Sequence, residues 1–416
     1  MFDVRRFVLP SGLRVLHAPD HAAPLVSFQT WFQVGSRDEQ PGKTGMAHLF
    51  EHLMFNQTES MQPGEMDRLI EQTGGDTNAA TWVDWTYYRS TVPARDLDLV
   101  MRLEADRMQH LVLEDEQLES ERDVVTNERL ERVEDDVEGF MDEELFRTAF
   151  TTHPYHWPTI GWMDDIRGLA KPDIHEFYAA YYAPNNATIV VAGDVTEDEL
   201  RRLLDRHYGR IPRTEMVTRT EIVEPPQTSE RRRVFAKPVP ADRAVFAYKT
   251  PGQAHPDWAV LEFICTLLAG GPSAGLYRRL HIELELCTAV SASVVPFRDP
   301  GLLQIWVNMM RGHTADEARQ VIDDTIDALK AAPVSEAEMA KAKNTVETDL
   351  WLELSTLDSR AEALGHYETT LGDFSGLFDT ARRLAEITAD DVTRVARKYL
   401  NVDQRTQIVC EPNLGE

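Results

Sequence analysis

Residues 174–193, IHEFYAAYYAPNNATIVVAG, have a counterpart 218 positions later in residues 392–411, VTRVARKYLNVDQRTQIVCE. Each stretch begins with apolar residues at helical spacing, passes through a short polar connection and ends in a run typical of a buried strand. The matched positions include Ile174 and Val392, Phe177 and Val395, Tyr181 and Tyr399, Thr188 and Thr406, and Val191 and Val409. This internal repeat predicts an α+β chain of two homologous halves, each an antiparallel sheet flanked by helices. The alternative is a chance similarity confined to one segment.

The boundary between the halves is expected where proline and polar residues replace the periodic pattern. Residues 224–233, EPPQTSERRR, have this composition. We therefore predict an N-terminal half over residues 1–223, a linker over 224–233 and a C-terminal half over 234–416. Within the first half, residues 4–18, 25–34 and 79–92 have strand patterns, whereas residues 46–56 and 96–137 have helical ones.

The composition excludes several classes of protein. A chain of 416 residues with 42% hydrophobic residues is long enough for two domains with their own cores. Because Asp and Glu outnumber Lys and Arg by 70 to 43, the net charge of −27 disfavours binding to nucleic acid or to anionic membrane surfaces. No apolar run approaches the roughly 20 residues of a membrane-spanning helix, and the N-terminal residues lack the apolar core of a signal peptide. We expect a cytoplasmic protein, or a periplasmic one if a leader has been removed.

Residues 45–55, GMAHLFEHLMF, place three polar side chains in a run that otherwise has the pattern of a core helix. At about 100° per residue, His48, Glu51 and His52 project into one arc of such a helix. Two imidazoles one turn apart can hold a single Zn²⁺ ion, with the carboxylate beside its water. This is the H-x-x-E-H spacing, the inverse of the commoner H-E-x-x-H. Since short motifs also arise by chance, a third ligand is required.

A second helical pattern, residues 116–133, offers that ligand. Glu121 and Glu128 fall on the same stripe as Leu118 and Val125, so two carboxylates are predicted on an otherwise apolar face. A carboxylate that faces the core needs a cation. The alternative is that the carboxylates pair with arginines on a solvated helix. The candidate arginines are Arg122, Arg129 and Arg132.

These residues resemble those of the M16 (pitrilysin/insulinase) zinc metallopeptidases. The H-x-x-E-H box, followed 76 residues after His52 by Glu128, is similar to the family's metal motif. Residues 74–81, GGDTNAAT, resemble the segment that follows the zinc helix, and residues 153–155 and 184–193 resemble later family segments. The length and the two-half repeat are similar to the M16B branch, which includes mitochondrial processing peptidase, and here to its zinc-bearing subunit.

The resemblance implies a role for each matched residue. It makes His48, His52 and Glu128 the zinc ligands and Glu121 a carboxylate that supports them. It makes Glu51 the general base, which takes a proton from the attacking water and returns it to the leaving amine.

The resemblance also implies that the backbone around Asn78 and Ala79 holds an extended substrate through main-chain hydrogen bonds. The alternative for this region is an ordinary hairpin that turns at Gly74 and Gly75.

The second half departs from the family pattern. In complete family sites this region supplies an arginine and, seven residues later, a tyrosine, which bind substrate and stabilise the oxyanion. The matching positions here are His281 and Thr288. Neither replaces its counterpart, because threonine cannot reach as tyrosine does and histidine is only partly charged at neutral pH. An alternative alignment uses Tyr277 with Arg278 or Arg279.

Three functions remain open from the sequence. The first is a zinc endopeptidase subunit that cleaves extended or unfolded peptides and forms a heterodimer with a related zinc-less subunit supplying the Arg/Tyr pair, or else a homodimer. The second is a non-catalytic assembly subunit, against which the intact metal motif argues. The third is a peptide carrier that binds without cutting.

Overall fold

The computed structural model describes residues 2–215 and 217–413. The residues form two compact units. Unit 1 consists of Met1–Glu131, Trp157–Ile222 and Glu353–Leu377, and unit 2 consists of Arg132–His156, Val223–Leu352 and Phe378–Glu416. Each unit has one sheet and its own apolar core, as the repeat predicts.

Unit 1 is built on a six-stranded sheet with the order β1-β2-β6-β3-β5-β4. The strands are β1 (Arg5–Val8), β2 (Arg14–Pro19), β3 (Leu25–Phe32), β4 (Asp76–Thr81), β5 (Thr86–Pro93) and β6 (Ala187–Gly193). β2 and β6 are parallel, and the other neighbours are antiparallel. β4 is therefore an edge strand, the position at which a further strand could add.

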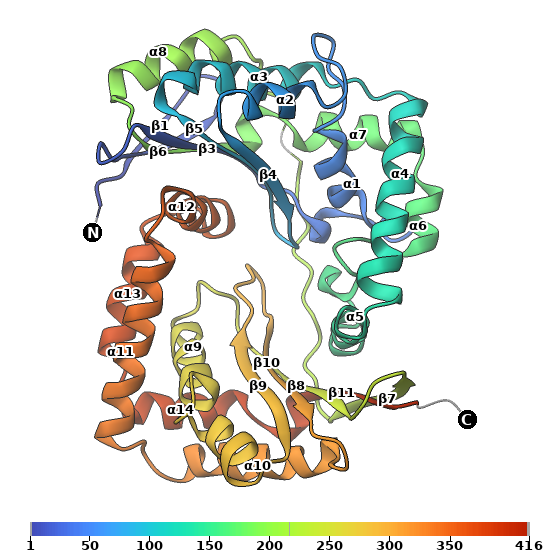
Figure 1. Cartoon of the computed structure of the whole chain (residues 1–416), viewed down its shortest axis with the longest axis vertical. Helices are drawn as coiled ribbons and strands as arrows, with labels where there is room; N and C mark the ends of the chain where they lie inside the picture. Colours follow the sequence, from blue (N-terminus) through green and yellow to red (C-terminus); the bar gives the residue numbers. More distant parts are fainter. Residues whose placement is uncertain (1, 216, 414–416) are drawn as a thin grey trace. The chain divides into compact units, whose positions relative to one another are not determined.

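Helices cover both faces of this sheet (Figure 1). On β3, Phe28 and Phe32 belong to the main core cluster, whereas Gln29 and Trp31 point to the opposite face, because side chains alternate along a strand. Unit 1 contains α1 (Met46–Leu53), α2 (Glu65–Glu71), α3 (Leu97–His110), α4 (Asp115–Arg129), α6 (Met163–Gly168), α7 (Lys171–Tyr181), α8 (Glu197–Tyr208) and α12 (Leu357–Leu371). α12 packs on the face that carries Trp31.

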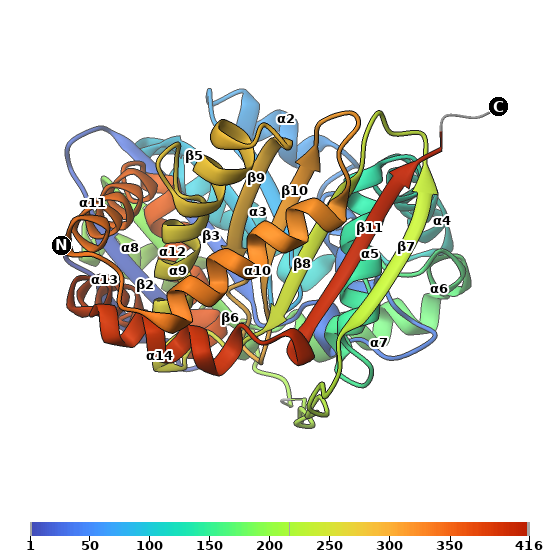
Figure 2. The same cartoon turned by 90° about the horizontal axis from the view of Figure 1, so that it is seen from below.

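Unit 2 has a five-stranded sheet with the order β7-β11-β8-β10-β9. The strands are β7 (Arg231–Lys237), β8 (Arg243–Lys249), β9 (Cys287–Val294), β10 (Leu302–Met309) and β11 (Arg405–Pro412). The helices are α5 (Val137–Ala149), α9 (Pro256–Ala269), α10 (Ala315–Ala331), α11 (Glu336–Glu353), α13 (Gly376–Glu386) and α14 (Ala389–Tyr399). In Figure 2, α10 crosses in front of the strands, α14 leads into the start of β11, and α5 lies behind β11 and β7.

The two sheets repeat one topology, which confirms the predicted pair of homologous halves. Numbered in chain order from β2 and from β7, the five shared strands have the same spatial order, first, fifth, second, fourth, third, in both sheets. The quoted repeat corresponds to α7 followed by β6 in unit 1 and to α14 followed by β11 in unit 2. In both units the last strand pairs in parallel with the first.

Two helices do not pack with the unit that surrounds them in the chain order: α5 lies in the first half of the sequence but belongs to unit 2, and α12 lies in the second half but belongs to unit 1. α5 lies against β7, β8 and β11 of unit 2, and α12 lies against β2, β3 and β6 of unit 1. Gly365 allows the second contact, because a Cβ atom there would lie 2.2 Å from the indole of Trp31. The predicted limits 1–223 and 234–416 follow the repeat and stay a prediction. β7 begins at Arg231, inside the predicted linker.

The predicted local elements in the first half correspond closely to those observed. The pattern over residues 46–56 becomes α1, and that over 96–137 becomes α3, α4 and a π-helical turn over residues 130–134. Among the described residues, no helix has the length and apolar character needed to cross a bilayer. The expected cytoplasmic location stays a prediction.

Candidate metal centre

The short helix α1 presents two imidazoles from its buried side. It begins after Gly45, whose φ of 87° lies in the left-handed region that favours glycine. Leu49, Phe50 and Leu53 of α1 are fully buried in the core of unit 1. His48 is 9% exposed, and the rings of His48 and His52 lie 4.9 Å apart at an angle of 76°. The apolar face thus holds the helix while the two rings approach each other.

Helix α4 supplies a carboxylate between these rings. The Oε2 atom of Glu128 lies 3.6 Å from Nε2 of His48 and 3.3 Å from Nε2 of His52. One ligand atom from each of the three residues lies within 4.8 Å of the others, and among the described residues this is the one such group that could hold a metal ion. Around a tetrahedral zinc ion with bonds of about 2.0–2.1 Å, ligand atoms are separated by about 3.3 Å. The donor set of two imidazole nitrogens and one carboxylate oxygen therefore suits zinc and leaves a fourth position open.

A second carboxylate of α4 lies behind His52. Oε2 of Glu121 is 3.6 Å from Nδ1 of His52, and Oε1 of Glu121 accepts a hydrogen bond from the Asn56 side chain at 2.7 Å. His52 lowers the pKa of Glu121 more than burial raises it, with further help from Asn56. The lowered pKa favours the ionised form of Glu121, whose carboxylate lies against the Nδ1 side of the His52 ring, where a carboxylate behind a metal-bound histidine is commonly found.

The electrostatics of the site favour a cation. Burial lowers the pKa of His52, but Glu121 and Glu128 together raise it by more than burial lowers it. The pKa of His52 is therefore about 9. The same negative charge that holds a proton on His52 would also hold a divalent ion. Arg122 and Arg129, considered as partners of these glutamates, donate hydrogen bonds to the carbonyl groups of Leu169 and Gly161. Glu121 and Glu128 both contact the histidines.

The remaining predicted residues of the first half lie on α1 and at the sheet edge. Glu51 is partly exposed and precedes His52 on α1. Asn78 and Ala79 lie on β4, which pairs with β5 on one side only. The side chain of Asn78 is exposed, and its Oδ1 atom accepts a hydrogen bond from the amide of Ala79. The roles of these residues stay predictions.

In unit 2, His281 and Thr288 are engaged locally. Nδ1 of His281 lies 2.8 Å from the carbonyl oxygen of Cys287, and the hydroxyl of Thr288 donates to the carbonyl of Asn308 at 3.1 Å. The alternative pair is engaged as well. Arg278 contacts Glu283, and Arg279 donates to Thr325.

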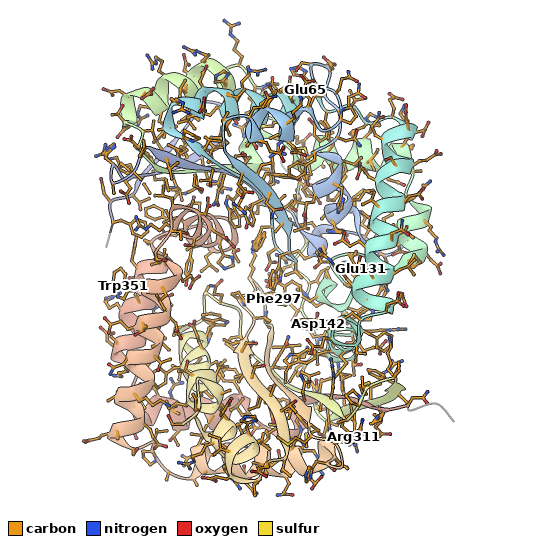
Figure 3. All side chains as sticks on the ribbon, viewed as in Figure 1. Glu65, Glu131, Asp142, Phe297, Arg311 and Trp351 are labelled. Carbon is orange, nitrogen blue, oxygen red and sulfur yellow. The ribbon has the colours of Figure 1, made fainter. Side chains whose placement is uncertain are left out.

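Unit 2 also contains an acidic recess that the sequence did not reveal. It lies between α5 and strands β9 and β10 and has a volume of about 480 Å³. Glu138 and Asp142 contribute carboxylates, and Trp306 contributes an aromatic side chain. Arg243 donates to Glu138 at 3.1 Å, so that carboxylate is partly neutralised. Figure 3 marks Asp142 on α5. A recess with carboxylates beside an indole suits a cationic side chain.

Sequence reasoning missed Asn56 and the contact of Arg129 with Gly161, both of which lie beside the candidate centre. Asn56 lies one turn beyond His52, and a search for polar residues at helical spacing could have found it. The contacts of Arg129 with Gly161 depend on tertiary packing and had no signal in the sequence.

Comparison with known proteins agrees with the resemblance. The family described as "Insulinase (Peptidase family M16)" matches residues 14–161, and "Peptidase M16 inactive domain" matches residues 169–346. A protein named zinc protease PqqE from Helicobacter pylori is 30% identical over 410 residues, covering 97% of this chain and 92% of that protein. A probable mitochondrial-processing peptidase subunit beta from Arabidopsis thaliana is 24% identical over 409 residues, covering 96% and 76%.

A solved structure has the same fold. The crystal structure of a protease from Helicobacter pylori superimposes with a TM-score of 0.95 at 29% identity, covering 99% of this chain and all of that one. With two family matches along most of its length and a relative aligned over nearly the whole chain, this protein belongs to the M16 peptidase family.

Proposed function

We propose that the chain is a zinc-dependent endopeptidase subunit that hydrolyses extended or unfolded peptides. The observation that carries the proposal is the convergence of His48, His52 and Glu128, whose ligand atoms lie within 4.8 Å of one another. Relatives named zinc proteases support the choice of metal. A non-catalytic assembly subunit would not need this set of donors.

The chain's own residues account for the chemistry. His48, His52 and Glu128 would hold the ion, which would polarise the peptide carbonyl and acidify the attacking water. Glu51, on the same helix, takes the proton from that water and transfers it to the departing amine, so that the carboxylate is regenerated at the end of the cycle. Glu121 keeps His52 oriented through its contact with Nδ1.

The edge strand β4 would hold the substrate. Its outer edge offers main-chain groups for an added peptide strand, and Asn78 and Ala79 lie in its middle. Main-chain recognition is independent of side-chain sequence and requires an extended peptide, which explains a preference for unfolded substrates.

The proposal is tested by zinc content and hydrolysis together. Native protein purified without chelators should contain about one zinc per chain by elemental analysis, and His52→Asn and Glu128→Gln should lower this value strongly. Cleavage is followed with an unfolded quenched-fluorescence peptide in the presence of the related zinc-less subunit. Parent protein without stoichiometric zinc, or hydrolysis that survives both substitutions, would refute the proposal.

A further inference from the structure

The two helices that carry the candidate zinc ligands are anchored at the same place in unit 1. Arg129, which follows Glu128 on α4, is 3% exposed, and its guanidinium group donates a hydrogen bond to the carbonyl of Gly161 at 2.8 Å. Its guanidinium group also lies 5.8 Å from the centre of the Trp162 ring. The ligand-bearing end of α4 is thus fixed to residues 161–162.

The start of α1 rests against the same two residues. A Cβ atom on Gly161 would lie 2.5 Å from the amide nitrogen and the Cα atom of Gly45, and one on Gly45 would lie 2.6 Å from the carbonyl oxygen of Ile160. The two backbones are therefore in direct contact. Thr44 strengthens the junction, because its hydroxyl donates to Asp165 at 2.7 Å and accepts from the amide of Trp162 at 2.9 Å.

A buried carboxylate holds the first turn of α1 in this position. Glu39 is 7% exposed and accepts hydrogen bonds from the amides of Gly45 at 2.9 Å and Ala47 at 2.8 Å. These amides have no partner within the helix, and His48 is the next residue. The first turn of α1 therefore has little freedom to move relative to Gly161.

We propose that Gly45, Gly161 and Arg129 form a brace that sets the distance between His48 on α1 and Glu128 on α4. Gly161 contacts one helix through its backbone and the other through its carbonyl group, so a displacement of Gly161 changes the separation of the two ligands. The three are positioning residues. The brace rests on the proposed zinc site and adds the element that preorganises it.

The first test compares two glycine substitutions. Gly161→Ala introduces a Cβ atom that the Gly45 backbone cannot accommodate without a shift. Gly42→Ala is the matched control, because Gly42 has φ of 86° against 85° for Gly161 and has open space around its Cβ position. Both variants place alanine at a similar positive φ, but only Gly161→Ala brings a Cβ atom into collision with a neighbouring backbone. We expect Gly161→Ala to bind zinc about 10- to 100-fold more weakly in competition with a chromogenic chelator, and Gly42→Ala to bind it like the parent.

The second test removes the bond from the side of α4. Arg129→Met retains the aliphatic part of the side chain but loses the donors, whereas Arg129→Lys retains a donor group and the charge. We expect the Met variant to lose zinc affinity and to change the visible spectrum of the Co²⁺-substituted protein, which reports ligand geometry. The Lys variant should recover part of both. A purely structural role for Arg129 would lower the melting temperature without changing the cobalt spectrum.

A third measurement separates this proposal from the zinc proposal. In the metal-free protein, amides of α1 should exchange hydrogen faster in Gly161→Ala and Arg129→Met than in the parent and in Gly42→Ala. If the parent binds no zinc, the proposed function fails while the exchange data still test the brace. Unchanged exchange in both variants, or zinc affinity and cobalt spectra equal to those of the parent, would overturn the brace.

Discussion

Glu51 is the residue on which the proposed chemistry depends most directly. It shares α1 with His48 and His52, yet the ligand atoms that converge belong to His48, His52 and Glu128. A substitution at Glu51 should therefore separate metal binding from proton transfer.

We predict that Glu51→Gln retains zinc and loses turnover. The amide has nearly the same size as the carboxylate but cannot accept the proton of the attacking water, so kcat should fall by about 10²- to 10⁴-fold. Elemental analysis and single-turnover hydrolysis give the two readouts. Glu71→Gln, at an exposed residue of α2, is the control and should leave both unchanged. A Glu51→Gln enzyme as fast as the parent would exclude Glu51 as the base.

At this scale the sequence predicted the ligand set and the carboxylate of Glu121, but not the backbone contact that holds the start of α1. Helical spacing was enough to bring His48 and His52 together, and a shared stripe was enough to suggest Glu121 and Glu128 as inward-facing carboxylates. The contact between Gly45 and Gly161 joins residues 116 positions apart and involves no side chain, so no residue pattern indicates it.

At the scale of elements, the contact of α12 with β3 depends on the absence of a Cβ atom at Gly365. Trp31 stacks on Tyr87 with ring centres 4.3 Å apart, and its indole fills the space beside Gly365. Gly365→Ala should push α12 from the sheet and destabilise the protein by about 1–3 kcal/mol, as overpacking of a core does.

The change should appear as a lower melting temperature in calorimetry. Gly168→Ala, at a site with open space and no strained backbone, serves as the control and should leave the melting temperature nearly unchanged. An equal melting temperature for Gly365→Ala and the parent would show that α12 adjusts without cost.

A histidine on α12 makes the packing of this helix against Trp85 sensitive to acid. Nδ1 of His366 accepts a hydrogen bond from the Trp85 indole at 3.1 Å, and burial lowers the pKa of His366 to about 4. The unfolded chain takes up this proton near pH 6.5, so between pH 6.5 and 4 the unfolded state binds more protons and His366 reduces stability as the pH falls.

His366→Gln retains an acceptor for Trp85 but cannot titrate. We predict that the variant gains stability relative to the parent as the pH falls from 7 to 4, by an amount on the order of 2 kcal/mol. Urea unfolding at several pH values measures the difference in the free energy of unfolding between the variant and the parent. Because both proteins have the same Asp and Glu residues, the titration of those residues cancels in this difference. A difference that does not depend on pH would show that His366 is accessible to protons in the folded state.

The sequence predicted the elements and the repeated topology, but it did not indicate the exchange of α5 and α12. A helical pattern shows which face of a helix is apolar, not which of two similar sheets will cover that face. Because the halves share one strand order, either sheet can accept a helix, and details such as the space at Gly365 decide the choice.

At the scale of the whole molecule, the question is whether one chain makes a complete peptidase. His281 and Thr288 stand where complete family members are expected to have arginine and tyrosine, and both contact nearby carbonyl groups. Neither is suited to stabilise an oxyanion. A homodimer would only bring a second copy of the same two residues, so a different subunit is the more consistent source of the pair.

We predict that the purified chain binds zinc but cleaves unfolded peptides slowly, and that a related zinc-less subunit carrying the Arg/Tyr pair restores activity. Because loss of one oxyanion donor costs about 10²- to 10³-fold in rate, the gain on mixing should be of that order. The rate should saturate at a one-to-one ratio in a titration followed by a quenched-fluorescence peptide. The same partner with its tyrosine changed to phenylalanine is the control, since it retains the interface and lacks the donor. Full activity of this chain alone would show that the oxyanion is stabilised within the chain itself, and equal activation by the control partner would show that the partner's tyrosine is not the donor.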